Sequence, residues 1–120
     1  MKSLCPLSFL ILLVVTSASA ADKDLLAEGK SLVTRNCSRC HAIGKEEESP
    51  LAQAPPLREI YLRYPIEQLS QGLSEGMGSR HREMPQIQFS AEQALAILNY
   101  LGSVTGIAPS ERITAPTRRR

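Results

Sequence analysis

The residues with the clearest chemistry stand together in the stretch Cys37-Ser38-Arg39-Cys40-His41. Two thiols separated by two residues on one helical turn reach the same edge of a planar ring. They can add across the two vinyl groups of a porphyrin, while the adjoining imidazole becomes an axial ligand of the iron. A Cys-x-x-Cys-His run is typical of a c-type haem attachment site. The stretch therefore predicts one covalently bound haem c, with His41 as its proximal ligand.

Two other kinds of site use the same residue types. A Cys-x-x-Cys pair serves enzymes as a thiol–disulfide redox centre, but that centre belongs to a βαβ unit, and no strand pattern here is convincing. A zinc site would have to combine Cys37, Cys40, His41 and His81. The neighbours Cys40 and His41 would have difficulty reaching one tetrahedral metal. The motif therefore favours haem over both alternatives.

The second axial ligand is expected from residues 76–89, which show no strong periodicity. This segment contains three side chains able to reach the iron: Met77, His81 and Met84. Met84 is the leading candidate, because it precedes Pro85 and lies nearer the last predicted helix than Met77. Ligation by His81 or Met77 and an open distal site remain the alternatives.

Residues 1–20 have the pattern of a secretory signal peptide. Lys2 gives a minimal positive start, an apolar run follows over 4–15, and Ala18-Ser19-Ala20 is a small-residue cleavage site. The apolar run is shorter than the ~20 residues of a membrane span, although an uncleaved anchor is an alternative. Cleavage would leave Cys37 and Cys40 as the only cysteines. Export to an oxidising compartment also fits the attachment of a haem.

Helical patterns cover much of the remaining chain. Apolar residues recur at helical spacing over 21–36, with Asp22 as the predicted N-cap. Gly29 stands in the middle of the apolar face, and a glycine there weakens a helix by ~1 kcal/mol relative to alanine. Close approach of another helix is the expected reason.

Further helices are predicted over 57–63, over 65–75 and from Ser90 onward. Ser90-Ala91-Glu92-Gln93 matches a capping box, and Gly102 is the predicted C′ residue of this last helix. The expected fold is therefore all-α, with three principal helices and connecting loops around the haem.

Length and composition allow one domain, over 21–105. The chain has 120 residues, of which 4% are aromatic and none is Trp, so a bound haem is expected to complete a thin core. A net charge of +2 gives no reason to expect nucleic acid as a partner. Residues 106–120 are predicted to be a disordered basic tail that ends in three arginines. Such a tail would at most contact an anionic membrane surface weakly.

With these residues, the chain resembles the class I monohaem cytochromes c, and in particular small bacterial periplasmic members. The resemblance extends from Asp24 to about Val104. Gly29 matches the small residue where the first and last helices of that family cross, and Met84 matches the distal ligand. Either Pro55 or Pro56 matches the proline whose carbonyl faces the proximal histidine. The resemblance implies thioethers at Cys37 and Cys40, with His41 and Met84 as axial ligands.

The resemblance also implies a function, namely single-electron transfer in the periplasm without enzymatic activity. The expected partners are redox proteins, such as a membrane oxidoreductase, an oxidase or a periplasmic dehydrogenase. Two alternatives stay open: a cytochrome subunit of a periplasmic dehydrogenase complex, and a haem sensor or enzyme with an open distal site.

Overall fold

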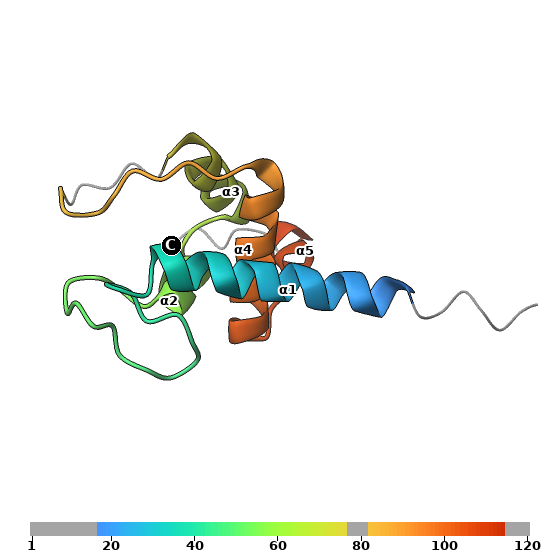
Figure 1. Ribbon diagram of the computed structural model, residues 1–120, viewed down its shortest axis with the longest axis horizontal. Helices are drawn as coiled ribbons and strands as arrows, with labels where there is room; N and C mark the ends of the chain where they lie inside the picture. Colours follow the sequence, from blue (N-terminus) through green and yellow to red (C-terminus); the bar gives the residue numbers. More distant parts are fainter. Residues whose placement is uncertain (1–16, 77–81, 115–120) are drawn as a thin grey trace, which may run out of the picture.

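The structure is a computed structural model that describes residues 17–76 and 82–114. Its regular elements are helices, and these two ranges contain no strand (Figure 1). The helices are α1 (Ser17–Asn36), α2 (Leu57–Arg63), α3 (Ile66–Glu75), α4 (Ala91–Thr105) and α5 (Pro109–Thr114). The predicted all-α class is confirmed, and the three principal helices are α1, α3 and α4. Within the described ranges, no helix has both the length and the apolar composition of a membrane span.

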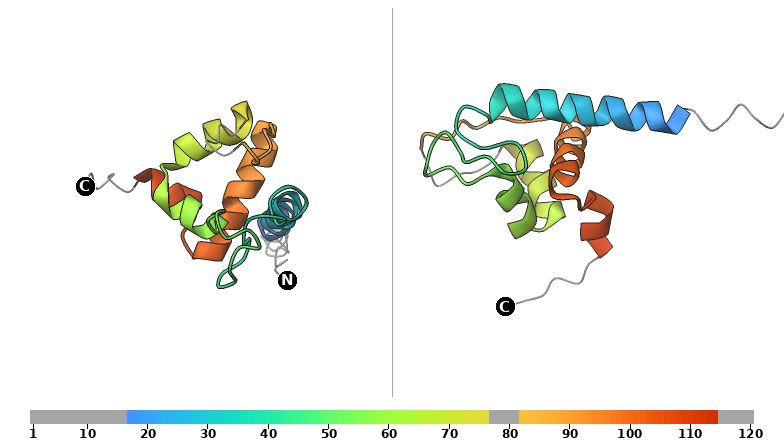
Figure 2. Two further views of the ribbon diagram at one scale, coloured as in Figure 1. Left: turned by 90° about the vertical axis from the view of Figure 1, so that its left-hand side faces the viewer. Right: turned by 90° about the horizontal axis from the view of Figure 1, so that it is seen from below.

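The crossing of α1 over α4 is the most extensive contact between helices (Figure 2). Gly29 lies at this crossing. A Cβ atom at Gly29 would lie 2.0 Å from the carbonyl oxygen of Ala96 and 2.8 Å from the Cβ of Tyr100. The predicted close approach of another helix to Gly29 is therefore confirmed, because only glycine leaves room for the α4 backbone.

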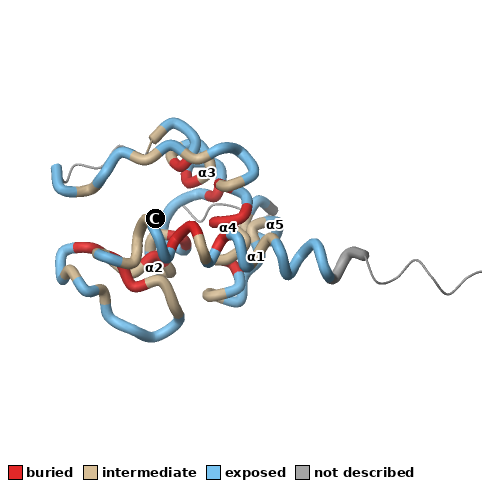
Figure 3. The backbone as a smooth tube through the Cα atoms, in the orientation of Figure 1, coloured by how far each residue is buried: buried red, intermediate tan, exposed pale blue. Residues whose placement is uncertain are grey.

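The hydrophobic core lies between α1, α2, α3 and α4 (Figure 3). Its buried members are mostly aliphatic: Leu32, Val33, Leu57, Tyr61, Ile66, Leu69, Leu73, Ala94, Ala96, Ile97, Leu98 and Leu101. Of the described aromatic residues, Tyr61 is completely buried, whereas Phe89 and Tyr100 are half-buried. The core is thus as poor in aromatic side chains as the composition predicts.

The N-terminus of α4 carries the predicted capping box. The Ser90 hydroxyl accepts a hydrogen bond from the Gln93 backbone N–H at 3.2 Å. The Gln93 side chain in turn accepts a hydrogen bond from the Ser90 backbone N–H at 3.0 Å. Two N–H groups that would otherwise lack partners are therefore satisfied, and this fixes where the last large helix begins.

Replacing Ser90 by alanine is expected to destabilise the protein by about 1 kcal/mol, because the cap of α4 is lost. For a domain of this size, the thermal midpoint should fall by roughly 4–8 °C. Circular dichroism melts of the haem-loaded protein measure the change. Ser103→Ala is the matched control, since the exposed Ser103 hydroxyl bonds only to the Tyr100 carbonyl inside the same helix. An unchanged midpoint for Ser90→Ala would contradict the prediction.

The predicted C-terminal end of the last helix, at Gly102, is wrong. The helix continues to Thr105, and Gly106 is its C-cap in the left-handed conformation, with φ 75°. Gly102 is instead needed inside the helix, because a Cβ atom there would lie 2.9 Å from the carbonyl oxygen of Ile107. Both glycines are suited to end a helix, so local sequence does not distinguish them.

Two predicted helix starts also differ from the structure. α1 begins at Ser17, so Asp22 lies inside the helix and is not its N-cap. Ala20 and Ala21, which have high helix propensity, continue the helix toward the N-terminus. α3 begins at Ile66, one residue later than predicted, because Pro65 has an extended backbone with ψ 144° and occupies the N-cap position.

The tail predicted to be disordered over 106–120 contains a helix, so the prediction is wrong for Pro109–Thr114. This helix, α5, contacts α3 and α4. Residues 115–120, with the terminal arginines, lie outside the described residues.

Candidate haem site

The Cys-x-x-Cys-His stretch forms a turn directly after α1. The Cys37 N–H continues the helix by donating to the Val33 carbonyl at 2.8 Å. The N–H groups of Cys40 and His41 then both donate to the Cys37 carbonyl, at 3.1 and 2.9 Å. The two cysteines are not joined by a disulfide. This single turn holds the two thiols and the imidazole as one compact unit, as attachment to a porphyrin requires.

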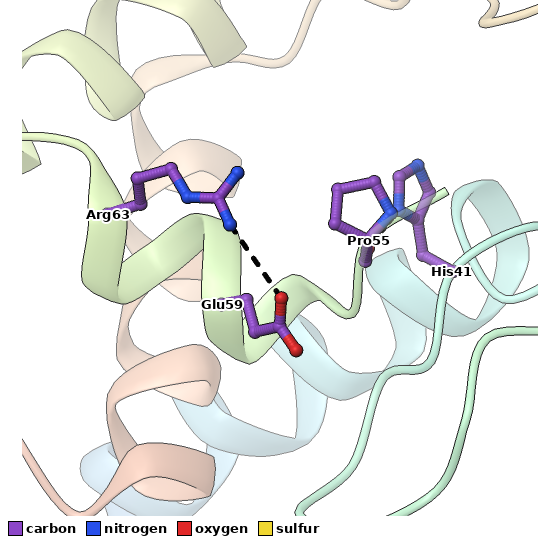
Figure 4. Close-up of polar contacts among 4 residues, drawn as sticks. All are labelled: His41, Pro55, Glu59 and Arg63. Atoms are coloured by element: carbon purple, nitrogen blue, oxygen red, sulfur yellow. Dashed lines mark hydrogen bonds and ion pairs between the residues drawn. The ribbon is translucent and has the colours of Figure 1, made fainter. Parts of the chain in front are cut away.

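His41 is buried, with 9% of the residue's surface exposed, and the orientation of its imidazole is fixed by one hydrogen bond. His41 Nδ1 lies 2.6 Å from the carbonyl oxygen of Pro55, which can only accept, so Nδ1 carries the proton. Figure 4 shows the two residues side by side. The lone pair of Nε2 is consequently free to bind a metal, and the carbonyl fixes the orientation of the ring. Of the two candidate prolines, Pro55 is the one that faces His41.

The segments around His41 and Pro55 are tied together by further backbone contacts. The Leu57 N–H, at the start of α2, donates to the Ala42 carbonyl at 2.9 Å. The Ala42 N–H donates to the Ser49 hydroxyl at 3.0 Å. Because the histidine segment and the first turn of α2 are bonded to each other, the position of His41 depends on the position of α2.

An apolar cavity lies beside this turn and is enclosed by side chains from α1, α2, α3 and α4. Its lining consists of Val33, Cys37, His41, Leu57, Ile60, Tyr61, Leu69, Leu73, Met84, Ile97, Leu98 and Leu101. A porphyrin is a flat apolar body, so aliphatic walls suit it. Two thiols, an imidazole nitrogen and a thioether sulfur are the donors that attach and ligate a c-type haem. The residues present therefore fit this cofactor.

The three candidates for the second axial ligand are placed differently. Met84 is half-buried and lines the same cavity as His41. Met77 and His81 lie outside the described residues. The structure thus brings one predicted ligand pair, His41 and Met84, to a common cavity.

The electrostatics of Cys37 disfavour the thiol–disulfide alternative. Burial raises the pKa of its thiol to about 11. A redox enzyme needs the opposite shift, because the thiolate is the reactive form. The described residues contain no group of three or more His, Cys, Asp or Glu side chains able to hold a metal ion, and His81, which the zinc alternative requires, lies outside them.

Sequence reasoning missed the importance of Tyr61 in this site. Its side chain is completely buried and lines the cavity, although the sequence indicated only that it belongs to a short helix. The spacing of Leu57 and Tyr61 at i and i+4, which puts both on one helix face, was the available signal. Ile60, also on α2, completes this wall.

An all-helical domain with a Cys-x-x-Cys-His turn beside an apolar cavity defines a class of proteins, those that attach haem covalently. A family model described as Cytochrome c matches residues 26–105, two thirds of the chain. The protein belongs to the cytochrome c family, and it is a haem-binding electron carrier with a covalently bound c-type haem. Comparisons with curated proteins and with solved structures find no match.

Proposed function

We propose that the protein carries single electrons in the periplasm on one haem c, with His41 and Met84 as the axial ligands. The observation that supports this most directly is that both side chains line one apolar cavity beside the Cys37–Cys40 turn. In this proposal the two cysteines form the thioether bonds, and Pro55 keeps the proton on His41 Nδ1. When bound, the haem supplies an iron that alternates between the ferric and ferrous states.

The proposed ligand set favours electron transfer over catalysis. If His41 and Met84 fill both axial positions, no coordination site is left for a substrate. The aliphatic lining from Leu69, Leu73 and Leu98 keeps water away, so little reorganisation accompanies the change of charge. The single Cys-x-x-Cys-His run supports one haem per chain.

The periplasmic location rests on the sequence alone. The signal-peptide pattern of residues 1–20 supports export, and export would bring the chain to the compartment where bacteria attach haem. The proposed partners are redox proteins that exchange electrons at an exposed haem edge through small, transient interfaces. Weak contact of the terminal arginines with an anionic membrane is part of the same proposal.

Replacing Met84 by alanine is expected to abolish the weak near-infrared band that a methionine–iron bond gives the oxidised protein. The reduction potential should fall, because thioether sulfur stabilises ferrous iron. Carbon monoxide should also bind the reduced variant rapidly. Absorption spectra of the oxidised and reduced proteins measure these changes.

Met77→Ala is the matched control, and it should keep the near-infrared band. A band that persists in Met84→Ala but disappears in Met77→Ala would identify Met77 as the distal ligand in place of Met84. A wild-type protein with haem but without the band would contradict methionine ligation and favour His81 or an open site. A chain that acquires no haem when expressed with the maturation machinery would overturn the whole proposal.

A further inference from the structure

Arg112, on α5, reaches back to the C-terminal end of α2, about fifty residues earlier in the chain. Its Nη1 donates to the carbonyl of Tyr61. Its Nη2 donates to the carbonyl of Tyr64 at 2.6 Å and, more weakly, to that of Leu62 at 3.5 Å. Its guanidinium group also lies over the Tyr61 ring, 4.6 Å from the centroid. One side chain therefore binds both the backbone and the aromatic face of α2.

The sequence explains why α2 needs an external donor at this end. In a continuous helix, the Tyr61 carbonyl would accept a hydrogen bond from the N–H four residues later. That residue is Pro65, which has no N–H. Carbonyls at the end of a helix also carry partial negative charge, which favours a cation. Arg112 supplies the donor that Pro65 lacks, together with a positive charge.

Tyr61 is held at its hydroxyl end as well. The hydroxyl donates to the Ile107 carbonyl at 2.9 Å, in the turn between α4 and α5. A Cβ atom on Gly102 would lie 3.2 Å from this hydroxyl, so the glycine leaves room for it. The ring, the carbonyl and the hydroxyl of Tyr61 are therefore all fixed by the C-terminal part of the chain.

The other end of α2 is bonded to the proximal histidine segment. The Leu57 N–H donates to the Ala42 carbonyl at 2.9 Å, and Pro55, two residues before α2, accepts the hydrogen bond from His41. Between these two ends, Leu57, Ile60 and Tyr61 line the cavity. A shift at the C-terminal end of α2 would consequently move the side chains that form one wall of the cavity.

We infer that Arg112 is a positioning residue for the haem site, acting through Tyr61 and α2 to hold this wall of the cavity closed. The inference rests on the proposed function, because it takes the cavity to hold the haem. Without Arg112, the Tyr61 and Tyr64 carbonyls must find water, and the last turn of α2 loosens. Water that follows into the cavity favours the more highly charged ferric state, so the reduction potential falls. A looser wall also lets the distal methionine leave the iron more often.

The test compares haem-loaded wild type with Arg112→Met, which keeps an unbranched apolar stem but removes the guanidinium group with its donors and charge. Loss of a charge-assisted hydrogen bond changes an equilibrium constant about tenfold, here in favour of the loosened wall. We therefore expect carbon monoxide to bind the ferrous variant about tenfold faster, with a lower reduction potential. The Tyr64 amide, bonded to the Ile60 carbonyl at 3.2 Å, should exchange its hydrogen faster by a similar factor.

Arg63→Met is the matched control, because Arg63 is also an arginine at the end of α2 but is exposed. Its one ion pair, with Glu59 at 3.8 Å, lies on the surface (Figure 4). Such pairs contribute little, so the carbon monoxide rate and the potential should stay at the wild-type values. If Arg112→Met fails to fold, Arg112→Lys carries the test. It keeps the charge but lacks the planar fork, and should change each quantity in the same direction by less.

The outcomes separate this inference from the proposed function. Wild type without haem, or without the methionine–iron band, contradicts the proposed function. The positioning role is overturned if wild type has the haem and the methionine–iron band but the Arg112 variants match it. The quantities compared are the carbon monoxide rate, the reduction potential and the hydrogen exchange of the Tyr64 amide. A change in melting temperature alone, with those three quantities unchanged, also overturns it, because Arg112 would then stabilise the fold without acting on the site.

Discussion

Replacing Gly29 by alanine is expected to lower the stability of the protein by about 3 kcal/mol, at the upper end of the range for an overpacked core. The added Cβ would lie 2.0 Å from the carbonyl oxygen of Ala96, which belongs to the backbone of α4. A side chain can rotate away from such a contact, but a helix backbone cannot. The two helices must therefore move apart where α1 and α4 make their most extensive contact.

The measurement is a thermal melt of the haem-loaded variant followed by circular dichroism. A loss of this size should lower the midpoint by roughly 12–24 °C in a domain of this length. Gly72→Ala is the matched control: Gly72 lies in α3, and a Cβ there would meet nothing within 4 Å. That variant should gain about 0.5–1 kcal/mol from higher helix propensity. A Gly29→Ala protein as stable as wild type would show that the crossing can widen at no cost.

The features that were predictable from the sequence are those determined by residues close together in the chain. Gly29 stood out because a glycine in the middle of an apolar helix face requires a reason, and the packing against Ala96 supplies it. The predicted bounds of α2 agree with the structure, and so does the capping box at Ser90. Each depends on residues within one or two helical turns, where propensity and capping dominate.

The features that were missed depend on residues far apart in the chain. Pro55 and Pro56 have equivalent carbonyls as far as local sequence is concerned, and only the path of the chain brings Pro55 to His41. Gly102 is compatible with a helix end, but its packing against Ile107 keeps it inside α4. α5 was predicted to be part of a disordered tail because its contacts are made by Arg112 with Tyr61. These residues lie about fifty positions apart, and no local sequence pattern indicates their pairing.

Replacing both Cys37 and Cys40 by alanine is expected to leave the chain largely unfolded. Without thioethers the haem is not retained, and the cavity it would fill is lined by much of the core, including Val33, Tyr61 and Leu98. These side chains would face an empty or wet space, and destabilisation rises with the volume of the cavity left behind. A small domain has a net stability of only about 5–15 kcal/mol, and this one has a single fully buried aromatic residue among those described. The remaining aliphatic contacts cannot offset the loss of the largest apolar body in the core.

Circular dichroism of the purified double variant tests this expectation, since an unfolded chain shows little helical signal and no sigmoidal melt. Ser38→Ala is the matched control within the same motif. Its hydroxyl bonds only to the Thr34 carbonyl, at 2.6 Å, so haem attachment and a cooperative melt should persist. A haem-free double variant with wild-type helicity and a cooperative transition would contradict the prediction that the chain needs its haem to fold. The four-helix core would then be stable by itself. The haem would bind to a preformed cavity and would not be required for the chain to fold.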